Sequence, residues 1–357
     1  RNLLLQENYG TISSPGNEPS VITVGASNYK NTPARADDVV TAFSSRGPAG
    51  NFDLVKPNVT APGVNVLAAY AGTTISGFEL AVTQINGTSM ASPHNAGSSL
   101  LVRQLRPTWS VSEVKSALEM TAEQNVVKED GTTAATPFDM GSGRVRVNLA
   151  ANSGLVLNET KANFQAANPA SGGQPAALNL ASMARRSCVG GCQFVRTFRS
   201  TKSFSQAYTA SLQGLGGTVT PSTFTVAAGG TVTLTINIDS TAVTPNGAFN
   251  FGKLEIVPQN APTLGVIDET LRLPIAIAVP PPVIGLNPAS QNISLTAGHP
   301  GTANFAIQNN GGYQLDYNID NTGNGQTSIY SAFNTGVAIG FRATVYSDPA
   351  TAGSAAQ

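Results

Sequence analysis

The chain has 357 residues, of which only 11% are charged, and its 20 basic and 20 acidic residues give a formal net charge of zero. Without a basic or acidic excess, nothing in the composition favours a nucleic-acid or membrane-surface partner. No apolar run approaches the roughly 18 residues of a spanning helix, so we expect no membrane-spanning segment. The length exceeds that of one ordinary domain, and we expect several.

Residues 1–157 mix short apolar stretches with helical patterns. The run at 3–5 fits the end of a buried strand. The β-branched runs at 21–24 and 64–67 are typical of further short strands. Because helical patterns separate these runs, they suit a parallel sheet, and the predicted fold class is α/β.

The most informative stretch is residues 86–94, with the sequence Asn-Gly-Thr-Ser-Met-Ala-Ser-Pro-His. Gly87 lacks a Cβ, so the backbone there can turn tightly and approach a substrate closely. Thr88 and Ser89 are good N-cap residues for a helix over 91–105. A serine at a helix N-terminus faces free amide donors, which suit an attacking oxygen and the oxyanion it creates. By itself, such a pattern also describes an ordinary capped helix.

Pro93 would fall in the first turn of this helix, where its missing N–H has no intrahelical partner. The Arg-Pro pair at 106–107 predicts the end of the helix. Ser110 and Glu113 then form a capping-box pattern that opens another helix, predicted to run to about Thr121.

From about residue 158 the helical signal stops, and short alternating stretches with Gly, Pro and Asn turns follow. This pattern predicts a β-sandwich over 158–279. The three prolines at 280–282 form a stiff spacer. A second β-domain is predicted over 283–357, and its small-residue tail leaves its completeness open. The strands predicted in the first β-domain are 194–198, 207–212, 218–226, 231–238, 252–257 and 270–278.

Cys188 and Cys192 are the only cysteines, and Val-Gly-Gly separates them. The glycines allow a tight local disulfide, which is the predicted state and is typical of an exported protein. A metal site would need more ligands than two cysteines without a nearby histidine, so no cofactor is evident.

Residues 86–94 resemble the nucleophile segment of the subtilisin-like serine proteases. Further stretches resemble other segments of that family in the family's order, and together the matches span 8–157. Asn58 stands where an Asp is usual. Asn95 replaces a small apolar helix residue, and we expect it to loosen the packing there. The other matching stretches are 19–27, 43–48, 56–64 and 138–145.

The resemblance implies that Ser89 is the nucleophile and that an asparagine side chain completes the oxyanion hole. Asn8 keeps the N-x-G pattern of the family and is the expected donor; the alternative is a turn residue. Gln6 and Glu7 replace the small residues that normally let substrate approach. Asn17 is a second candidate, but it lies too close to the next predicted strand.

A serine hydroxyl attacks a carbonyl slowly unless a base takes its proton and a third group holds that base. His94 follows Ser89 by five residues on the same predicted helix, so its side chain points about 140° away. The resemblance makes it a structural histidine. His299, the other histidine, falls in a Gly- and Pro-flanked loop and is expected at the surface. The family's D-T/S-G and H-G-T-H segments do not occur, so we expect both residues in a missing N-terminal segment, and nothing supports a lysine base.

The resemblance therefore implies a partial subtilisin-like parallel sheet with helices, followed by two β-sandwich-like domains, the first of them fibronectin type III-like. The expected function is that of a secreted serine endopeptidase that cleaves proteins or peptides through an acyl-enzyme on Ser89. The chain alone is expected to be unstable and inactive. Calcium is common in the family, but its usual ligands cannot be placed. The alternative is a non-catalytic binding or structural protein that retains a decayed protease domain, which Gln6, Glu7 and the absent triad partners favour.

Overall fold

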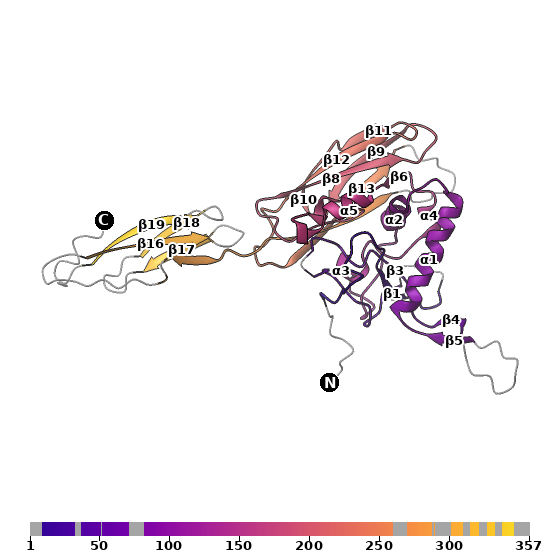
Figure 1. Cartoon of the computed structure of the whole chain (residues 1–357), viewed down its shortest axis with the longest axis horizontal. Coiled ribbons are helices and arrows are strands. Elements are labelled where there is room, and N and C mark those ends of the chain that lie inside the picture. The colour runs from indigo at the N-terminus through magenta and orange to yellow at the C-terminus, as the bar shows by residue number, and fades with distance from the viewer. Residues whose placement is uncertain are drawn as a thin grey trace. The chain divides into compact units, whose positions relative to one another are not determined.

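The computed structural model, drawn in Figure 1, describes residues 9–32, 37–50, 52–70, 82–259, 270–287, 289, 301–309, 315–320, 327–332 and 338–345. Contacts between residues divide the chain into two compact units. The first contains 1–185, 191–239 and 250–277, and the second contains 186–190, 240–249 and 278–357.

A small sheet forms the centre of the N-terminal part of the first unit. Its strands are β1 (Val24–Asn28), β2 (Val39–Val40) and β3 (Val59–Pro62), in the order β2-β1-β3. β1 and β3 run parallel, whereas β2 pairs antiparallel with the other edge of β1. A parallel pair is thus present, in a mixed α/β arrangement, although the first strand begins at Val24 rather than Val21.

The helices of this part are α1 (Thr88–Leu105), α2 (Val111–Met120), α3 (Pro137–Met140) and α4 (Val147–Ala150). α1 packs against β1 and β3, as Figure 1 shows. The contact is made by three small side chains, Ala91 of the helix with Ala26 and Ala61 of the strands, which let the backbones approach closely. The predicted capping box of α2 is confirmed, with Ser110 and Glu113 each accepting from the other's backbone N–H.

The predicted strand at 64–67 does not join the parallel sheet. The chain leaves β3 at Gly63 and forms β4 (Val66–Ala69), which pairs antiparallel with β5 (Val82–Ile85) in a separate two-stranded hairpin. Asn65 makes this change of direction possible because it adopts a left-handed backbone conformation, with φ of 52°. The assignment of this segment to a parallel sheet was therefore wrong.

Two larger sheets follow in the first unit, one with the strand order β10-β12-β8-β6 and the other with β11-β9-β13-β14-β7. β12 pairs antiparallel with β8, and β14 pairs parallel with β7. Alternate residues of β12 are buried, as the predicted period of two requires. The strands are β6 (Leu155–Leu157), β7 (Met183–Arg185), β8 (Cys192–Ser200), β9 (Gln206–Gln213), β10 (Gly216–Thr220), β11 (Thr223–Val226), β12 (Thr231–Asp239), β13 (Phe249–Pro258) and β14 (Leu271–Ala278).

Two details of this region differ from expectation. The single strand predicted at 218–226 is two strands, β10 and β11, which Pro221 separates and which lie in different sheets. The helical signal also does not stop at 158. Helix α5 (Lys161–Ala166) follows, and the Thr160 side chain caps its first turn by accepting from the Asn163 N–H. Two short 3₁₀ helices follow, η2 (Pro169–Ser171) and η3 (Pro175–Ala177).

The second unit contains a three-stranded sheet in the order β15-β16-β19 and a two-stranded sheet of β17 and β18. Much of the predicted second β-domain, 283–357, lies outside the described residues. The predicted domain limits at 157, 279 and 283 stay predictions. The strands are β15 (Ile284–Asn287), β16 (Gly301–Asn309), β17 (Leu315–Asp320), β18 (Thr327–Ala332) and β19 (Ala338–Val345).

Both cysteines are disulfide-bonded. Because the sequence contains only Cys188 and Cys192, they bond to each other, which confirms the predicted disulfide. Among the helices that the structure describes, none combines the length and the apolar character needed to cross a bilayer.

Candidate active site

Ser89 lies in the first turn of α1, and its side chain is exposed. The N-cap is Gly87, not Thr88 or Ser89 as expected, and no side chain caps the helix. Instead, the Met90 and Ala91 N–H groups both donate to the Gly87 carbonyl, at 3.0 and 3.3 Å. Within the described residues the Ser89 hydroxyl makes no hydrogen bond, so it is not committed to a structural role.

The loop before Ser89 is fastened to the end of β3. The Gly87 N–H donates to the Gly63 carbonyl at 2.8 Å, and the Asn65 N–H donates to Asn86 Oδ1 at 2.6 Å. A Cβ on Gly63 would lie 2.6 Å from the Ala26 Cβ and 2.8 Å from the Gly87 oxygen. Only glycine fits there, so the glycine of the 56–64 stretch holds the Ser89 loop against the sheet. The sequence marked Gly63 as part of a motif but did not reveal this role.

Pro93 is inside α1 rather than in its first turn, because the helix begins at Thr88. Proline has no N–H, so the Ser89 carbonyl lacks the helical hydrogen bond that residue 93 would otherwise donate.

The described part of the chain brings no histidine side chain to Ser89. His94 is exposed, and its Nδ1 lies 2.9 Å from the Met90 carbonyl oxygen on the same helix. His299 lies outside the described residues, as do Asn8, Gln6 and Glu7. Asn17 is described and lines a different cavity from the one beside the nucleophile segment.

A cavity of about 220 Å³ lies next to the nucleophile segment, with Thr88 in its wall. The rest of the wall comes from 12–16, the start of β1 and the two stretches that include Ser45 and Pro57. Among the described residues of its wall, none has a charged side chain. A second cavity, of about 720 Å³, is bounded by 17–20, the start of α2 and the α5 region, and does not include Ser89 or Thr88.

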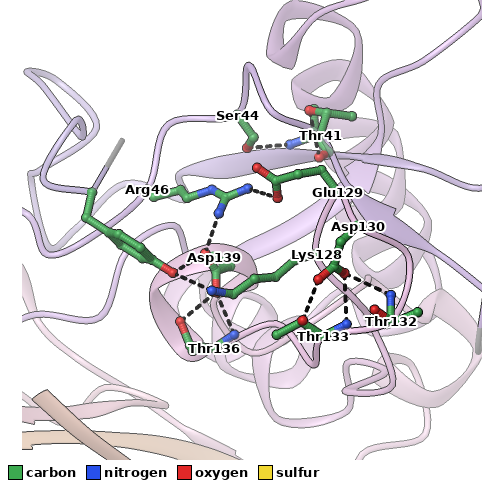
Figure 2. Close-up of polar contacts among 12 residues, drawn as sticks. Thr41, Ser44, Arg46, Lys128, Glu129, Asp130, Thr132, Thr133, Thr136 and Asp139 are labelled. Carbon is green, nitrogen blue, oxygen red and sulfur yellow. Dashed lines mark hydrogen bonds and ion pairs between the residues drawn. The ribbon is translucent and has the colours of Figure 1, made fainter. Parts of the chain in front are cut away.

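A buried ion cluster joins two of the family-like stretches, as Figure 2 shows. Arg46 Nη1 lies 2.9 Å from Asp139 Oδ1, and Arg46 Nη2 lies 2.5 Å from Glu129 Oε2. The Asp139 side chain is fully buried, and the Thr136 N–H and hydroxyl donate to its Oδ2 at 2.7 Å. The sequence identified the stretches of Arg46 and Asp139 separately; it did not show that they meet.

A second buried cluster contains Lys56, Asn58, Lys115 and Glu119. Lys56 Nζ donates to Asn58 Oδ1 at 2.9 Å, and Asn58 Nδ2 donates to Glu119 Oε1 at 3.1 Å. Burial, together with the nearby Lys115 charge, lowers the pKa of Lys56 to about 7. Burial also raises the pKa of Glu119 and lowers that of Lys115. Asn58, noted as a departure from the family, is therefore the neutral bridge between the cation and the carboxyl group.

Asn95, the other departure, is buried on α1. Its Oδ1 accepts no hydrogen bond from any described residue. A buried carbonyl oxygen without a donor is destabilising. This is a physical reason to expect looser packing at this position of the helix.

Three leucines in the last turns of α1 are exposed. Leu100, Leu101 and Leu105 are 69%, 52% and 66% exposed, respectively. On the hairpin before α1, Leu67 and Val82 are also more than half exposed.

Among the described residues, no group of three or more His, Cys, Asp or Glu side chains is arranged to hold a metal ion. Calcium stays an expectation from the family resemblance.

Comparison with known proteins gives a consistent result. The model of the subtilase family matches residues 4–143. A "CO(2)-response secreted protease" of Arabidopsis thaliana is 36% identical over 170 residues, which are 44% of this chain and 22% of that protein. "Subtilisin-like protease SBT3" of Solanum lycopersicum is 39% identical over 140 residues, 35% of this chain and 18% of that protein. "Subtilisin-like protease SBT4.4" of Arabidopsis thaliana is 42% identical over 132 residues, again 35% of this chain and 18% of that protein. The chain therefore spans about a fifth of the length of these relatives.

Proposed function

Because residues 4–143 are a segment of the subtilase family, we propose that the protein is a secreted serine endopeptidase whose nucleophile is Ser89. The observation that carries this proposal is the state of Ser89 itself. Its side chain is exposed in the first turn of an 18-residue helix, and glycine, not a hydroxyl side chain, caps that helix. The hydroxyl is thus available, next to amide donors that favour negative charge.

In the proposed reaction, Ser89 Oγ attacks the carbonyl carbon of the scissile peptide while a general base takes its proton. The carbonyl oxygen becomes an oxyanion, which the Ser89 N–H and the Asn8 side chain stabilise. The C–N bond then breaks, and the leaving amine takes the proton from the base. Water, deprotonated by the same base, hydrolyses the acyl-enzyme and restores Ser89.

The base and its orienting carboxylate are proposed to come from a segment upstream of Arg1. The only described histidine, His94, bonds to its own helix and is five residues from Ser89. The uncovered leucines of α1 support a further segment, because they offer an apolar surface beside the same helix that carries Ser89.

The proposed substrates are proteins or peptides. The described residues that line the cavity beside Thr88 are uncharged, and such a cavity would accept an uncharged side chain next to the scissile bond. Secretion is supported by the disulfide and by the name of one relative, a secreted protease. We propose that the β-domains, the first of them fibronectin type III-like, position substrate or anchor the enzyme.

A non-catalytic binding protein on an inherited scaffold is the alternative. Gln6 and Glu7 favour it, because they place bulk and an acid beside the proposed oxyanion donor. The two functions differ in whether Ser89 is needed for peptide hydrolysis.

The test is hydrolysis of an unfolded protein by the full-length protein, extended upstream of Arg1. Ser89→Ala is compared with Ser92→Ala, because Ser92 is an exposed serine on the same helix. The proposal predicts a loss of at least about 10³-fold in kcat for Ser89→Ala only. Equal activity of the Ser89→Ala variant and the wild type, or no activity in a folded wild type, would reject it.

A further inference from the structure

Four asparagines of the chain begin the pattern Asn-x-Ser/Thr, which accepts an N-linked glycan in secreted proteins. Such a short pattern also occurs by chance, so the sequence alone does not rank the four. The glycan is attached while the chain is still unfolded, and the folded protein must then hold it in solvent. The structure therefore tests each position for space. The four asparagines are Asn58, Asn86, Asn158 and Asn292.

Asn58 has no room for a glycan. Its side chain is buried, and Thr60, the third residue of its pattern, is fully buried. The nitrogen that would carry the sugar, Asn58 Nδ2, donates to Glu119 Oε1 at 3.1 Å. A sugar on this nitrogen would break that bond and crowd a closely packed interior, so a chain modified there would not fold to this structure.

Asn86 is exposed, but it stands three residues before Ser89. Its Oδ1 accepts from the Asn65 N–H at 2.6 Å, which fastens the loop before the nucleophile. A glycan is bulky, and here it would lie beside the hydroxyl that the proposed reaction needs. The proposed function thus disfavours Asn86. Asn292 lies outside the described residues.

Asn158 meets the requirements. It is the first residue after β6, in the surface loop that leads to α5, and its side chain is exposed. Its Oδ1 accepts from Ser110 Oγ at 2.6 Å, whereas its Nδ2 donates to no described residue. Thr160, which completes the pattern, is exposed as well. The nitrogen that would carry the glycan is therefore available in the folded protein.

The loop around Asn158 is held by bonds that a glycan would leave intact. The Asn158 carbonyl accepts from Asn179 Nδ2 at 3.1 Å, and the Glu159 carbonyl accepts from Ser112 Oγ at 3.1 Å. The Glu159 carboxylate accepts from the Asn179 N–H at 2.7 Å. None of these bonds involves Asn158 Nδ2, so a glycan there would break no hydrogen bond of the described structure.

The surface beside Asn158 is open and partly apolar. Val111, the neighbour of Ser110 at the start of α2, is 68% exposed. Val111, Ser112 and Glu159 all line the cavity of about 720 Å³. A glycan that starts at Asn158 would begin at the edge of this cavity and would meet solvent and exposed side chains rather than the core.

We propose that Asn158 carries an N-linked oligosaccharide. In the transfer, the amide nitrogen of Asn158 attacks C1 of the first sugar of a lipid-linked oligosaccharide diphosphate. The new C–N bond replaces the C–O bond to the diphosphate, the lipid diphosphate leaves with the electron pair of that bond, and the amide gives up one proton. This inference rests on the proposed secretion, because the sugar donor and its transferase belong to the secretory pathway of eukaryotic cells.

The test uses the full-length protein secreted from eukaryotic cells. Its glycans are removed with peptide N-glycosidase, which leaves an aspartate at each occupied asparagine, and mass spectrometry of the peptides is compared with an untreated sample. We expect conversion at Asn158 and none at Asn58 or Asn86. Asn158→Gln should lose one glycan, which electrophoresis shows as a faster band. Thr160→Ser, which preserves the pattern, should keep the glycan, as should Asn152→Gln, a change at an exposed asparagine outside any such pattern.

An unmodified Asn158 in the secreted, folded protein would overturn the inference and leave the proposed secretion and the proposed peptidase activity intact. A glycan on Asn58 of the folded protein, or on Asn86 in place of Asn158, would also overturn it, because burial and exposure would then not decide the site. A full-length protein found only in the cytosol would reject the proposed secretion and, with it, the glycan.

Discussion

Lys56 Nζ lies 2.9 Å from Asn58 Oδ1, and both side chains are buried. Lys115 and Glu119, also buried, complete the cluster, and the exposed Glu18 lies near its edge. Two lysines thus share one buried carboxyl group, and the asparagine supplies no charge. Burial disfavours the charged form of Lys56 and the nearby Lys115 charge adds to this effect, so the pKa of Lys56 falls to about 7.

This cluster predicts that the protein becomes more stable from about pH 7 toward pH 9.5. In that range the unfolded chain holds a proton on Lys56, with an ordinary pKa of 10.5, whereas the folded protein does not. Because the unfolded state then binds one more proton than the folded state, raising the pH disfavours the unfolded state, and the free energy of unfolding rises. Below pH 7 both states carry the proton, and Lys56 adds no further slope.

The measurement is the urea midpoint of the full-length protein at several pH values. Lys56→Met should flatten the slope, because Lys115 and Glu119 then balance each other. Lys161→Met, a change at an exposed lysine, should keep the wild-type slope. An equal slope in the wild type and Lys56→Met would show that Lys56 is charged in the folded state.

Asn95→Ala should stabilise the protein by about 1 kcal/mol. It removes a buried oxygen that accepts no hydrogen bond from the described residues, and alanine is the better helix former. Gln104→Ala tests helix propensity alone, because Gln104 is exposed on the same helix. The measurement is the melting temperature of both variants. A lower melting temperature for Asn95→Ala than for the wild type would mean that the Asn95 side chain has a partner.

Gly143→Ala should destabilise the protein by more than about 3 kcal/mol. The residue has φ of 120°, and an added Cβ would lie 2.0 Å from the Glu123 carbonyl oxygen. Gly131→Ala is the control, because Gly131 also has positive φ, at 74°, but no atom lies within 4 Å of the added carbon. It should show only the backbone strain, about 1 kcal/mol. Similar urea midpoints for the two variants would contradict the close approach at Gly143.

Leu101→Gln tests whether another segment covers α1. In the 357-residue chain the side chain is half exposed, so the change should alter stability by less than about 0.5 kcal/mol. In the full-length protein, a covering segment would make the loss about 1.5–3 kcal/mol, the value of one buried leucine. Small effects in both proteins would show that this face stays in water.

Local signals explain what could be predicted from the sequence. The capping box of Ser110 and Glu113 and the alternation along β12 depend on residues close in the chain, and both are present. The split at Pro221 and the hairpin of β4 and β5 were missed because runs of β-branched residues do not show which partner strand they join.

In the candidate site, too, local features could be predicted from the sequence and tertiary contacts could not. Ser89 was found from its own nine-residue stretch, and the structure places it, exposed, in the first turn of the helix. The hydrogen bond from the Tyr9 hydroxyl to Asp139 Oδ1 spans 130 residues and involves ordinary side chains, so no local pattern could reveal it. The placement of Gly63 against Ala26 likewise depends on tertiary packing.

The most direct test of the central claim is covalent labelling with a serine-directed fluorophosphonate, followed by mass spectrometry of the modified peptide. The full-length protein and the 357-residue chain are compared, each as wild type, Ser89→Ala and Ser92→Ala. Our account predicts labelling of Ser89 in the full-length protein, retained in Ser92→Ala, lost in Ser89→Ala, and absent from the 357-residue chain. A folded full-length protein that takes no label at Ser89 would contradict the account and favour a binding protein on an inherited scaffold.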